Sequence, residues 1–258
     1  MTGIAANVSD SERKIQEQFT SRAPVYDEVS AWIVDTGMLA AIVGQCRVGR
    51  EAELLDVCCG TGAIGGAFKG RVRRRVGIDL TQEMLEHARE RLDEVYQGSC
   101  EKLPFADSSF DIVVNRQALH FVENPGKAIR EMFRVLAPGG QLLLTHRIPY
   151  GATDAAWWEK VNREKQRLAR NFFVEETLAQ LISDAGFRAL SVTDYFLWES
   201  ICRWVDSPEA RNQSEKVFEL YKSAPSEVLK LRGITMTEHE IRDRWRWAIF
   251  SAFKPRQA

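Results

Sequence analysis

The chain has 258 residues, 45% of them hydrophobic, and its 35 basic and 36 acidic side chains nearly balance. A chain of this length buries enough apolar surface for one well-packed domain with a small accessory part. The balanced charge argues against a surface that attracts nucleic acid or anionic lipid, so we expect a small-molecule substrate and no nucleic-acid partner.

Helices are predicted first along the chain. Asp10–Phe19 has a polar start followed by spaced apolar residues, which is typical of a capped amphipathic helix. A second helix is expected across Trp32–Cys46. From there to residue 145, short apolar runs alternate with helical stretches such as Gln82–Arg91 and Pro125–Val135, which predicts a parallel sheet with helices on both faces. The predicted strands are Glu53–Cys58, Arg75–Asp79, Asp93–Gln97, Phe110–Asn115 and Gln141–Thr145.

After Arg147 the pattern changes to longer elements. A tryptophan-containing charged helix is expected over Ala155–Arg170, and Ser207–Ile241 is expected to be helical as well. Alternating residues near the C-terminus predict a last strand over Arg244–Phe253. Between these segments we expect a helix over Val174–Ala185, closed by Gly186, and a strand over Ala189–Glu199.

The five cysteines are odd in number and lack paired C-x-x-C spacing, which argues against a disulfide framework or a zinc site. The sequence has no run of about 18 apolar residues to span a bilayer, and its first residues lack the apolar core of a signal peptide. We therefore expect a cytoplasmic protein, a monomer or homodimer, without a bound metal and without stable membrane insertion.

A glycine turn follows the first predicted strand, and an acid ends the second. The run from Leu54 to Gly62 reads LLDVCCGTG, and Asp79 follows about twenty residues later. In a doubly wound α/β sheet both strand ends open onto one crevice, where glycines let the backbone approach a ligand and the acid accepts both hydroxyls of a ribose. The pattern predicts a nucleoside site.

The spacing of the glycines leaves two kinds of nucleoside open. The dinucleotide fingerprint G-x-G-x-x-G can be traced through Gly60, Gly62 and Gly65. Asp56, at the strand end before the turn, would repel a pyrophosphate but would pair with the ammonium group of a ligand. A cationic cofactor is therefore favoured over NAD.

These motifs, together with the blocks Gly98–Phe105 and Arg134–Gly140, resemble the class I S-adenosylmethionine-dependent methyltransferases, in particular the small-molecule branch that includes enzymes of ubiquinone and menaquinone biosynthesis. The resemblance implies an α/β fold: a Rossmann-like, doubly wound, seven-stranded sheet, mostly parallel with an antiparallel last strand at the sheet edge. It implies S-adenosylmethionine as cofactor and S-adenosylhomocysteine as product. It also implies an N-terminal helical lid (1–50), a cofactor-binding core (51–150), and a C-terminal part (151–258) with a helical substrate cover at about 203–241.

The resemblance assigns the cofactor's parts to particular residues. Gly60 and Gly62 would contact its methionine part, with an ordinary strand-to-helix turn as the alternative. Asp79 would take the ribose hydroxyls, with capping of the next helix as the alternative, although Thr81 is the better cap. The full set of expected cofactor-binding residues is Tyr26, Asp56, Cys58, Gly60, Gly62, Asp79, Leu80, Met84, Ser99, Cys100, Glu101 and Asn115.

The chain departs from the family pattern in two places. Cys58 stands where the family usually has glycine, and we expect it and Cys59 to pack in the strand as unreactive thiols. Ser99-Cys100 replaces an Asp-Ala pair, and serine is a weaker, uncharged acceptor for the adenine amine. Adenine binding is therefore assigned to the backbone of Cys100 and Glu101. The side chains expected to cover the ring are those of Leu80, Met84 and Leu103.

The methyl acceptor is expected beside the residues that follow the fourth strand. His120 is the first candidate for a general base, because histidine is readily poised near neutral pH; His146 is a weaker one. A structural histidine bonded to a loop carbonyl is the open alternative, since related enzymes often work by proximity and desolvation. Arg116 and Arg147 suggest an acceptor that carries a carboxylate. The expected substrate-binding residues are Tyr26, Arg116, Gln117, His120, Arg147 and Trp158, with an aromatic wall drawn from Tyr26, Trp157, Trp158, Phe172, Phe173, Trp198 and Trp204.

These expectations favour methyl transfer to oxygen or carbon of a small, aromatic or carboxylated metabolite. An alternative is a quinone-ring C-methyltransferase, which would need a lipophilic prenyl channel or a membrane-facing helix. An alternative of another class is a cofactor-binding protein that moves no methyl group, either a regulatory subunit or a catalyst that uses the sulfonium only electrostatically. The motifs predict cofactor binding in all three cases.

Overall fold

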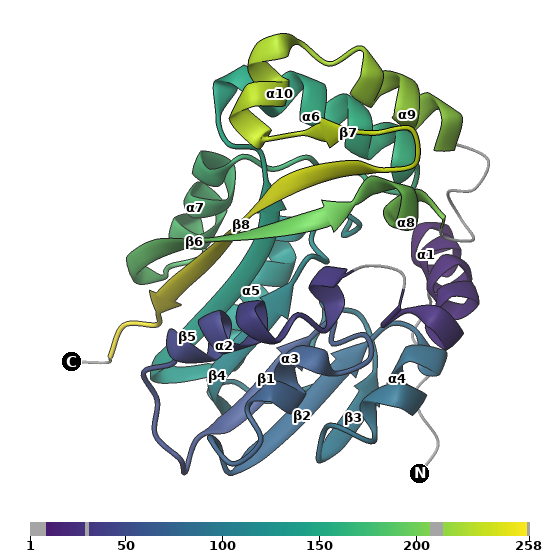
Figure 1. Cartoon of the computed structure of the whole chain (residues 1–258). Coiled ribbons are helices and arrows are strands. Elements are labelled where there is room, and N and C mark those ends of the chain that lie inside the picture. The colour runs from purple at the N-terminus through teal and green to yellow at the C-terminus, as the bar shows by residue number, and fades with distance from the viewer. Residues whose placement is uncertain (1–8, 29–30, 207–213, 257–258) are drawn as a thin grey trace.

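The computed structural model describes residues 9–28, 31–206 and 214–256, and it is an α/β structure built on one sheet (Figure 1). Within these residues seven strands follow one another in the order β3-β2-β1-β4-β5-β8-β6, and a short strand, β7, pairs with β8. The strands are β1 (Glu53–Val57), β2 (Arg74–Asp79), β3 (Glu94–Gln97), β4 (Phe110–Arg116), β5 (Leu136–Ile148), β6 (Arg188–Ser200), β7 (Thr235–Met236) and β8 (Ile241–Phe253).

Several helices begin at a residue whose side chain caps them. Ser9 and Glu12 form a reciprocal capping box at the start of α1, and the Asn124 side chain accepts the Lys127 N–H at the start of α5. The helices are α1 (Asp10–Arg22), α2 (Thr36–Gly44), α3 (Ala63–Ala67), α4 (Gln82–Ala88), α5 (Pro125–Val135), α6 (Ala152–Lys165), α7 (Glu175–Asp184), α8 (Ile201–Val205), α9 (Ser214–Lys222) and α10 (Ser226–Arg232), with short 3₁₀ turns η1 (Ala23–Val25) and η2 (Ala31–Ile33).

The sheet is covered on both faces because neighbouring residues of each strand point to opposite sides. Leu54 and Ile112 belong to the apolar core that includes α2, α3 and α6, whereas Leu55 and Val113 belong to the core with α5 and α7. Strands β1 to β5 are parallel, so they read as continuous apolar runs. The predicted doubly wound, Rossmann-like architecture is confirmed.

Two predictions about the C-terminal half and one about the N-terminal half needed correction. The last strand, β8, lies between β5 and β6 and is antiparallel to both, so β6 and not β8 forms the edge. The segment 207–241 is not helical throughout: α9 and α10 are followed by β7, and β8 already begins at Ile241. Residues 207–213 lie outside the described residues. In the N-terminal half, the helix predicted over Trp32–Cys46 is replaced by η2 followed by the shorter α2.

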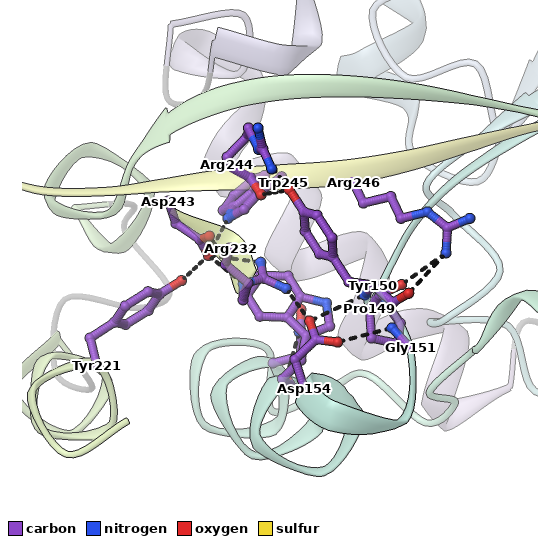
Figure 2. Close-up of polar contacts among 12 residues, drawn as sticks. Pro149, Tyr150, Gly151, Asp154, Tyr221, Arg232, Asp243, Arg244, Trp245 and Arg246 are labelled. Carbon is purple, nitrogen blue, oxygen red and sulfur yellow. Dashed lines mark hydrogen bonds and ion pairs between the residues drawn. The ribbon is translucent and has the colours of Figure 1, made fainter. Parts of the chain in front are cut away.

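A helical cap, defined here as α6, α8, α9 and α10, covers the region of β6 and β8 (Figure 1). Tryptophan side chains of α6, α8 and β8 fill the space beneath it, because large aromatic rings supply most of the buried apolar area. Figure 2 shows that Arg232 of α10 also reaches Asp154 of α6 and Asp243 of β8, which ties the cap to the sheet.

The order of the strands fixes where a ligand binds. The chain winds outward from β1 through β2 to β3, and then returns to place β4 on the other side of β1. In open α/β sheets, ligands bind outside the carboxyl ends of the strands at such a switch point. The residues that follow β1, β2 and β4 are therefore brought together, and α1 lies beside α4 next to them (Figure 1).

Candidate functional site

The turn after β1 has the backbone geometry that its glycines allow. Gly60 and Gly62 have φ values of +53° and +78°, which glycine adopts without a steric cost. A Cβ on Gly62 would lie 3.3 Å from the Cα of Ala88, so a side chain at this position would push α4 away from the turn. Gly62 therefore sets the packing of the turn. Gly62 does not line either of the two cavities, A and B, that are described below. Its predicted contact with the cofactor therefore stays a prediction.

Asp79 closes β2 and is held by backbone donors. Its Oδ2 accepts the N–H of Gly60 at 2.9 Å, and its Oδ1 accepts the N–H of Thr81 at 2.9 Å. Thr81 occupies the N-cap position of α4, but its side chain makes no capping bond, so the predicted division of roles is wrong: Asp79 supports the helix start. A carboxylate has about four acceptor positions, and two remain for ligand hydroxyls. Burial raises the pKa of Asp79, and backbone N–H donors counter that effect.

A cavity of about 800 Å³, called cavity A here, opens over this carboxylate. Ile15 and Phe19 of α1 form one wall of cavity A, and Gln16 and Thr20 fasten α1 to the α4 region through bonds to Leu80 O and the Glu83 carboxylate, both 2.8 Å long. The sequence predicted a helical lid, but not these bonds. Nine of the expected cofactor-binding residues line cavity A: Tyr26, Cys58, Gly60, Asp79, Leu80, Met84, Ser99, Cys100 and Glu101.

The far end of cavity A is shaped by the loop after β3. Ser99 Oγ accepts the N–H of Glu101 at 3.3 Å, and Glu101 accepts the N–H of Asn124 at 3.1 Å. These bonds order the loop in which Ser99 replaces the aspartate of the family pattern. Leu103, expected to cover the adenine ring, is buried in the core behind cavity A and is not among its lining residues.

Cys58 directly follows β1, packs against the core shared with α5 and α7, and also lines cavity A. Its φ is +56°, a value that costs a residue with a Cβ about 1–3 kcal/mol, which explains why glycine suits this position. Cys59 packs against Leu85, Ala88 and Leu92. A hydrogen bond between the Cys58 and Cys100 side chains together with burial raises the pKa of the Cys58 thiol, and burial raises that of Cys59. Both thiols stay protonated, as the expectation of unreactive cysteines requires.

A second cavity of about 320 Å³, cavity B, continues from the glycine turn and is lined by one carboxyl group and one guanidinium group. Asp56 is 2% exposed, its Oδ2 accepts the Gly65 N–H at 2.9 Å, and burial raises the pKa of its carboxyl to about 7. Arg116 lines cavities A and B and donates to Trp32 O at 3.1 Å and Ile33 O at 2.8 Å. Arg116 thus fixes η2, a role that the sequence did not predict.

Asn115 lies beneath cavities A and B and lines neither of them. The residue is fully buried at the end of β4, and its Nδ2 donates to the Val57 carbonyl at 2.8 Å. The side chain therefore holds the ends of β1 and β4 together, and a direct contact with the cofactor is not what this geometry favours.

Two further cavities extend from cavity A toward the helical cap. Cavity C, about 360 Å³, lies between Phe19, Trp32 and Trp247, and cavity D, about 300 Å³, lies against α6. Gln117 lines cavities A, C and D, and its φ is +52°, a strained value typical of functional sites. Its Oε1 accepts the Arg147 backbone N–H at 2.7 Å, which holds it at this junction.

Two buried histidines face this region. His120 lines cavities C and D, and neither ring nitrogen has a hydrogen-bond partner in the described part of the chain, so the expected bond to a loop carbonyl is not formed. Burial, aided by His146 and Arg147, holds the pKa of His120 well below its usual value, so it is neutral and not poised near pH 7. His146 Nδ1 donates to Arg147 O at 2.9 Å, and burial lowers its pKa to about 4.

Arg147 lines cavities C and D among aromatic rings. Its Cζ lies 4.7 Å, 4.8 Å and 3.9 Å from the ring centroids of Trp158, Trp204 and Trp245, and its Nη2 donates to Asn162 Oδ1 at 2.6 Å. Burial lowers the pKa of Arg147 to about 9. The structure thus brings Gln117, His120, Arg147 and Trp158 together, as the sequence predicted.

Five of the seven residues predicted to form an aromatic wall line cavity C or D. Phe172, Phe173 and Trp158 line cavity D, and Tyr26 and Trp204 line cavity C. Trp198 is 42% exposed on the edge strand β6, so its assignment was wrong. Trp157 is buried in the cap, where its Nε1 donates to Leu220 O. Sequence reasoning missed Asn162 and Gln166, because polar residues on a charged helix give no signal that they face inward.

The described residues contain no group of three or more histidine, cysteine, aspartate or glutamate side chains arranged to hold a metal ion. Within the same part of the chain, none of the helices has the length and apolar character needed to cross a membrane.

Comparison with known proteins agrees with this geometry. Residues 55–144 match the family model described as a methyltransferase domain. The chain is 30% identical over 195 residues to the uncharacterized methyltransferase YcgJ of Bacillus subtilis, covering 72% of this chain and 73% of that protein. The crystal structure of that protein has a TM-score of 0.77 at 23% identity, covers 86% of this chain and 99% of that chain, and supports the fold.

Two curated relatives carry named activities. The chain is 30% identical over 151 residues to the ubiquinone/menaquinone biosynthesis C-methyltransferase UbiE of Geotalea daltonii, covering 53% of this chain and 64% of that protein. It is 31% identical over 161 residues to the malonyl-[acyl-carrier protein] O-methyltransferase of Erwinia pyrifoliae, covering 60% of this chain and 59% of that protein. The chain thus spans less than two thirds of either relative.

Proposed function

This chain belongs to the class I S-adenosylmethionine-dependent methyltransferases, and we propose that it methylates an oxygen or carbon atom of a small, flat metabolite that occupies cavities C and D. The observation that carries the proposal is the position of Gln117. This strained residue borders cavity A on one side and cavities C and D on the other, so a donor and an acceptor on its two sides would meet there.

The residues of cavities A and B fit S-adenosylmethionine. Asp79 keeps acceptor positions for the two ribose hydroxyls, beside an apolar side chain, Met84, for the adenine. In cavity B, Asp56 complements the ammonium group of the methionine part, and Arg116 complements its carboxylate. Bringing that ammonium group next to Asp56 favours its ionised form, so cofactor and carboxylate stabilise each other.

Bound S-adenosylmethionine supplies a methyl carbon on a positively charged sulfur, and an acceptor lone pair forms the new bond while the sulfur keeps the electrons of the broken one. The protein has to align the acceptor and exclude water. Lid residues Phe19 and Tyr26 and the aromatic walls of cavities C and D support both tasks. Because its ring is neutral and has no partner, His120 can take the proton that an acceptor hydroxyl or acidic carbon loses.

The named activities of the relatives include both C- and O-methyl transfer, so they leave the acceptor atom open. The side chains that line cavities C and D favour a polar acceptor over a prenylated quinone. Cavity D ends on Asn162, Gln166 and Arg147, and a polyprenyl tail would have to desolvate these side chains.

The test is incubation with methyl-labelled S-adenosylmethionine and a panel of phenols, carboxylated aromatics and quinones, followed by mass spectrometry. We expect labelled product and S-adenosylhomocysteine release with the first two groups. Product from quinones alone would favour the ring C-methyltransferase. Cofactor binding without release by any acceptor would favour the protein that moves no methyl group.

A variant decides whether His120 acts as a base. We expect His120→Gln to lower kcat by about 10²-fold, the usual size of a lost proton transfer, while the KM for the cofactor stays unchanged. Steady-state kinetics with the acceptor found above checks this. A kcat within threefold of the wild type would show that proximity and desolvation suffice.

A further inference from the structure

We propose that cavities C and D select an acceptor that carries a carboxylate on a planar ring, and that Arg147 binds this carboxylate. The inference rests on the proposed function and names its substrate class. Arg147 forms no ion pair within the described part of the chain, because no carboxylate there lies within 4.0 Å of its guanidinium. The residue is buried, with 5% of its surface exposed.

A buried arginine elsewhere in the same core shows what full pairing looks like. Arg232 is completely buried, and its guanidinium lies 2.7 Å from the Asp154 carboxylate and 2.8 Å from that of Asp243 (Figure 2). Arg147 has instead one amide oxygen, that of Asn162, and an Nε without any hydrogen-bond partner. A buried guanidinium left in this state costs free energy, which an anionic ligand would recover.

The charge of the lining residues points the same way. Cavities C and D are lined by two arginines, Arg22 and Arg147, and by no aspartate or glutamate among the described residues. Asn162, Gln166 and Gln117 supply uncharged amide groups around them. The Arg147 guanidinium, with no carboxylate of the described residues within 4.0 Å and with low-dielectric walls around it, would attract an anion.

The shape of the cavities favours a planar ring. Three indole rings surround the Arg147 guanidinium, and Phe172 and Phe173 face it across cavity D. Arginine binds a planar carboxylate through parallel hydrogen bonds, so one guanidinium in a narrow slot is sufficient. An acceptor held this way directs its other end toward Gln117 and cavity A.

The experiment is calorimetric titration of the protein saturated with S-adenosylhomocysteine. The probes are the 2-, 3- and 4-hydroxybenzoates and the matching hydroxybenzamides, which share a shape and differ in charge. We expect at least one hydroxybenzoate to bind tenfold or more tightly than its amide. We expect Arg147→Met to remove that preference while the affinity for S-adenosylhomocysteine stays within twofold.

The matched control is Arg242→Met. Arg242 lies on β8, its guanidinium is near the Trp198 ring, and it does not line cavity C or D. This variant should keep the preference for the carboxylate. The proposal is overturned if no hydroxybenzoate binds more tightly than its amide, or if Arg147→Met keeps the preference. Failure of S-adenosylhomocysteine itself to bind would reject the proposed function, whereas its binding without a carboxylate preference would reject only this inference.

Discussion

Two buried arginines, Arg147 and Arg232, both lie against Trp158, with their Cζ atoms 4.7 Å and 4.1 Å from its ring centroid, yet their surroundings differ. Arg232 belongs to a closed cluster, in which Asp154 and Asp243 also accept hydrogen bonds from backbone and side-chain donors (Figure 2). Arg147 belongs to an open cluster, which contains polar atoms without partners and borders two cavities. Buried charge thus serves the fold where it is fully paired, and it serves ligand binding where pairing is incomplete.

The largest effect expected from this comparison is on folding. Arg232→Met leaves two carboxylates buried without their cation, and we expect it to lower the free energy of unfolding by about 3–5 kcal/mol. Urea denaturation followed by circular dichroism measures this. The matched variant Arg147→Met loses no ion pair, and methionine packs well against aromatic rings, so we expect a change below about 1 kcal/mol. Equal losses in the two variants would remove the distinction.

The open cluster should also make stability depend on pH through His146. Its pKa is lowered to about 4 in the folded protein and is near 6.5 in the unfolded chain, so the unfolded chain binds more protons between these values. The stability that the neutral histidine supports is present above pH 6.5 and is lost as the pH falls toward 4.

We therefore expect the wild type to lose about 2 kcal/mol more than His146→Asn between pH 7 and pH 5. Asparagine keeps a donor for the Arg147 carbonyl, and the difference between the two proteins cancels the titration of their carboxyl groups. Urea denaturation at both pH values is the measurement. An identical loss in the two proteins would contradict the neutral, buried state of His146.

A variant at Asp79 tests whether this buried carboxylate in cavity A binds a ligand, as Arg147 of the open cluster is proposed to do. Asp79→Ala should weaken S-adenosylhomocysteine binding at least tenfold, about 1.4 kcal/mol or more, because both ribose hydroxyls lose their acceptor. Isothermal calorimetry measures this. Asp107→Ala is the control, since it removes an exposed carboxylate that does not line cavity A. An unchanged affinity in Asp79→Ala would remove Asp79 from the cofactor site.

The smallest effect is expected from backbone strain. Cys58 and Gln117, which both border cavity A, have positive φ values, whereas the residues of the closed cluster do not. Cys58→Gly should relieve strain, and the gain is limited to about 1 kcal/mol because glycine loses more conformational freedom on folding. Thermal unfolding with and without S-adenosylhomocysteine checks this. A loss of stability would mean that packing of the thiol matters more than strain.

Local patterns predicted much of the fold. Pro125–Val135 carries an asparagine cap, a proline at the first position and an apolar face, and its bounds were predicted as found. Alternation of strands and helices predicted the parallel part of the sheet. The place of β8 between β5 and β6 was missed, because the pairing of distant strands depends on which partner completes the core and not on the strand's own residues.

The site residues likewise fall into those that a local motif predicted and those that it did not. Asp79 and Gly60 were predicted because their motif encodes a backbone geometry and a charge at a fixed place in the fold. The absence of an ion pair at Arg147 among the described residues, and the inward position of Asn162, depend on packing between α6 and β5 and leave no mark in the local sequence. Asn115 shows the converse: a polar residue at a strand end is used to hold two strands together.

A crystal structure of the protein with S-adenosylhomocysteine and 4-hydroxybenzoate tests the central claim most directly. The account predicts the ribose hydroxyls at the Asp79 carboxylate in cavity A and the carboxylate of the second ligand at the Arg147 guanidinium. Either ligand seated elsewhere, or cavities C and D without the hydroxybenzoate at saturating concentration, would contradict it.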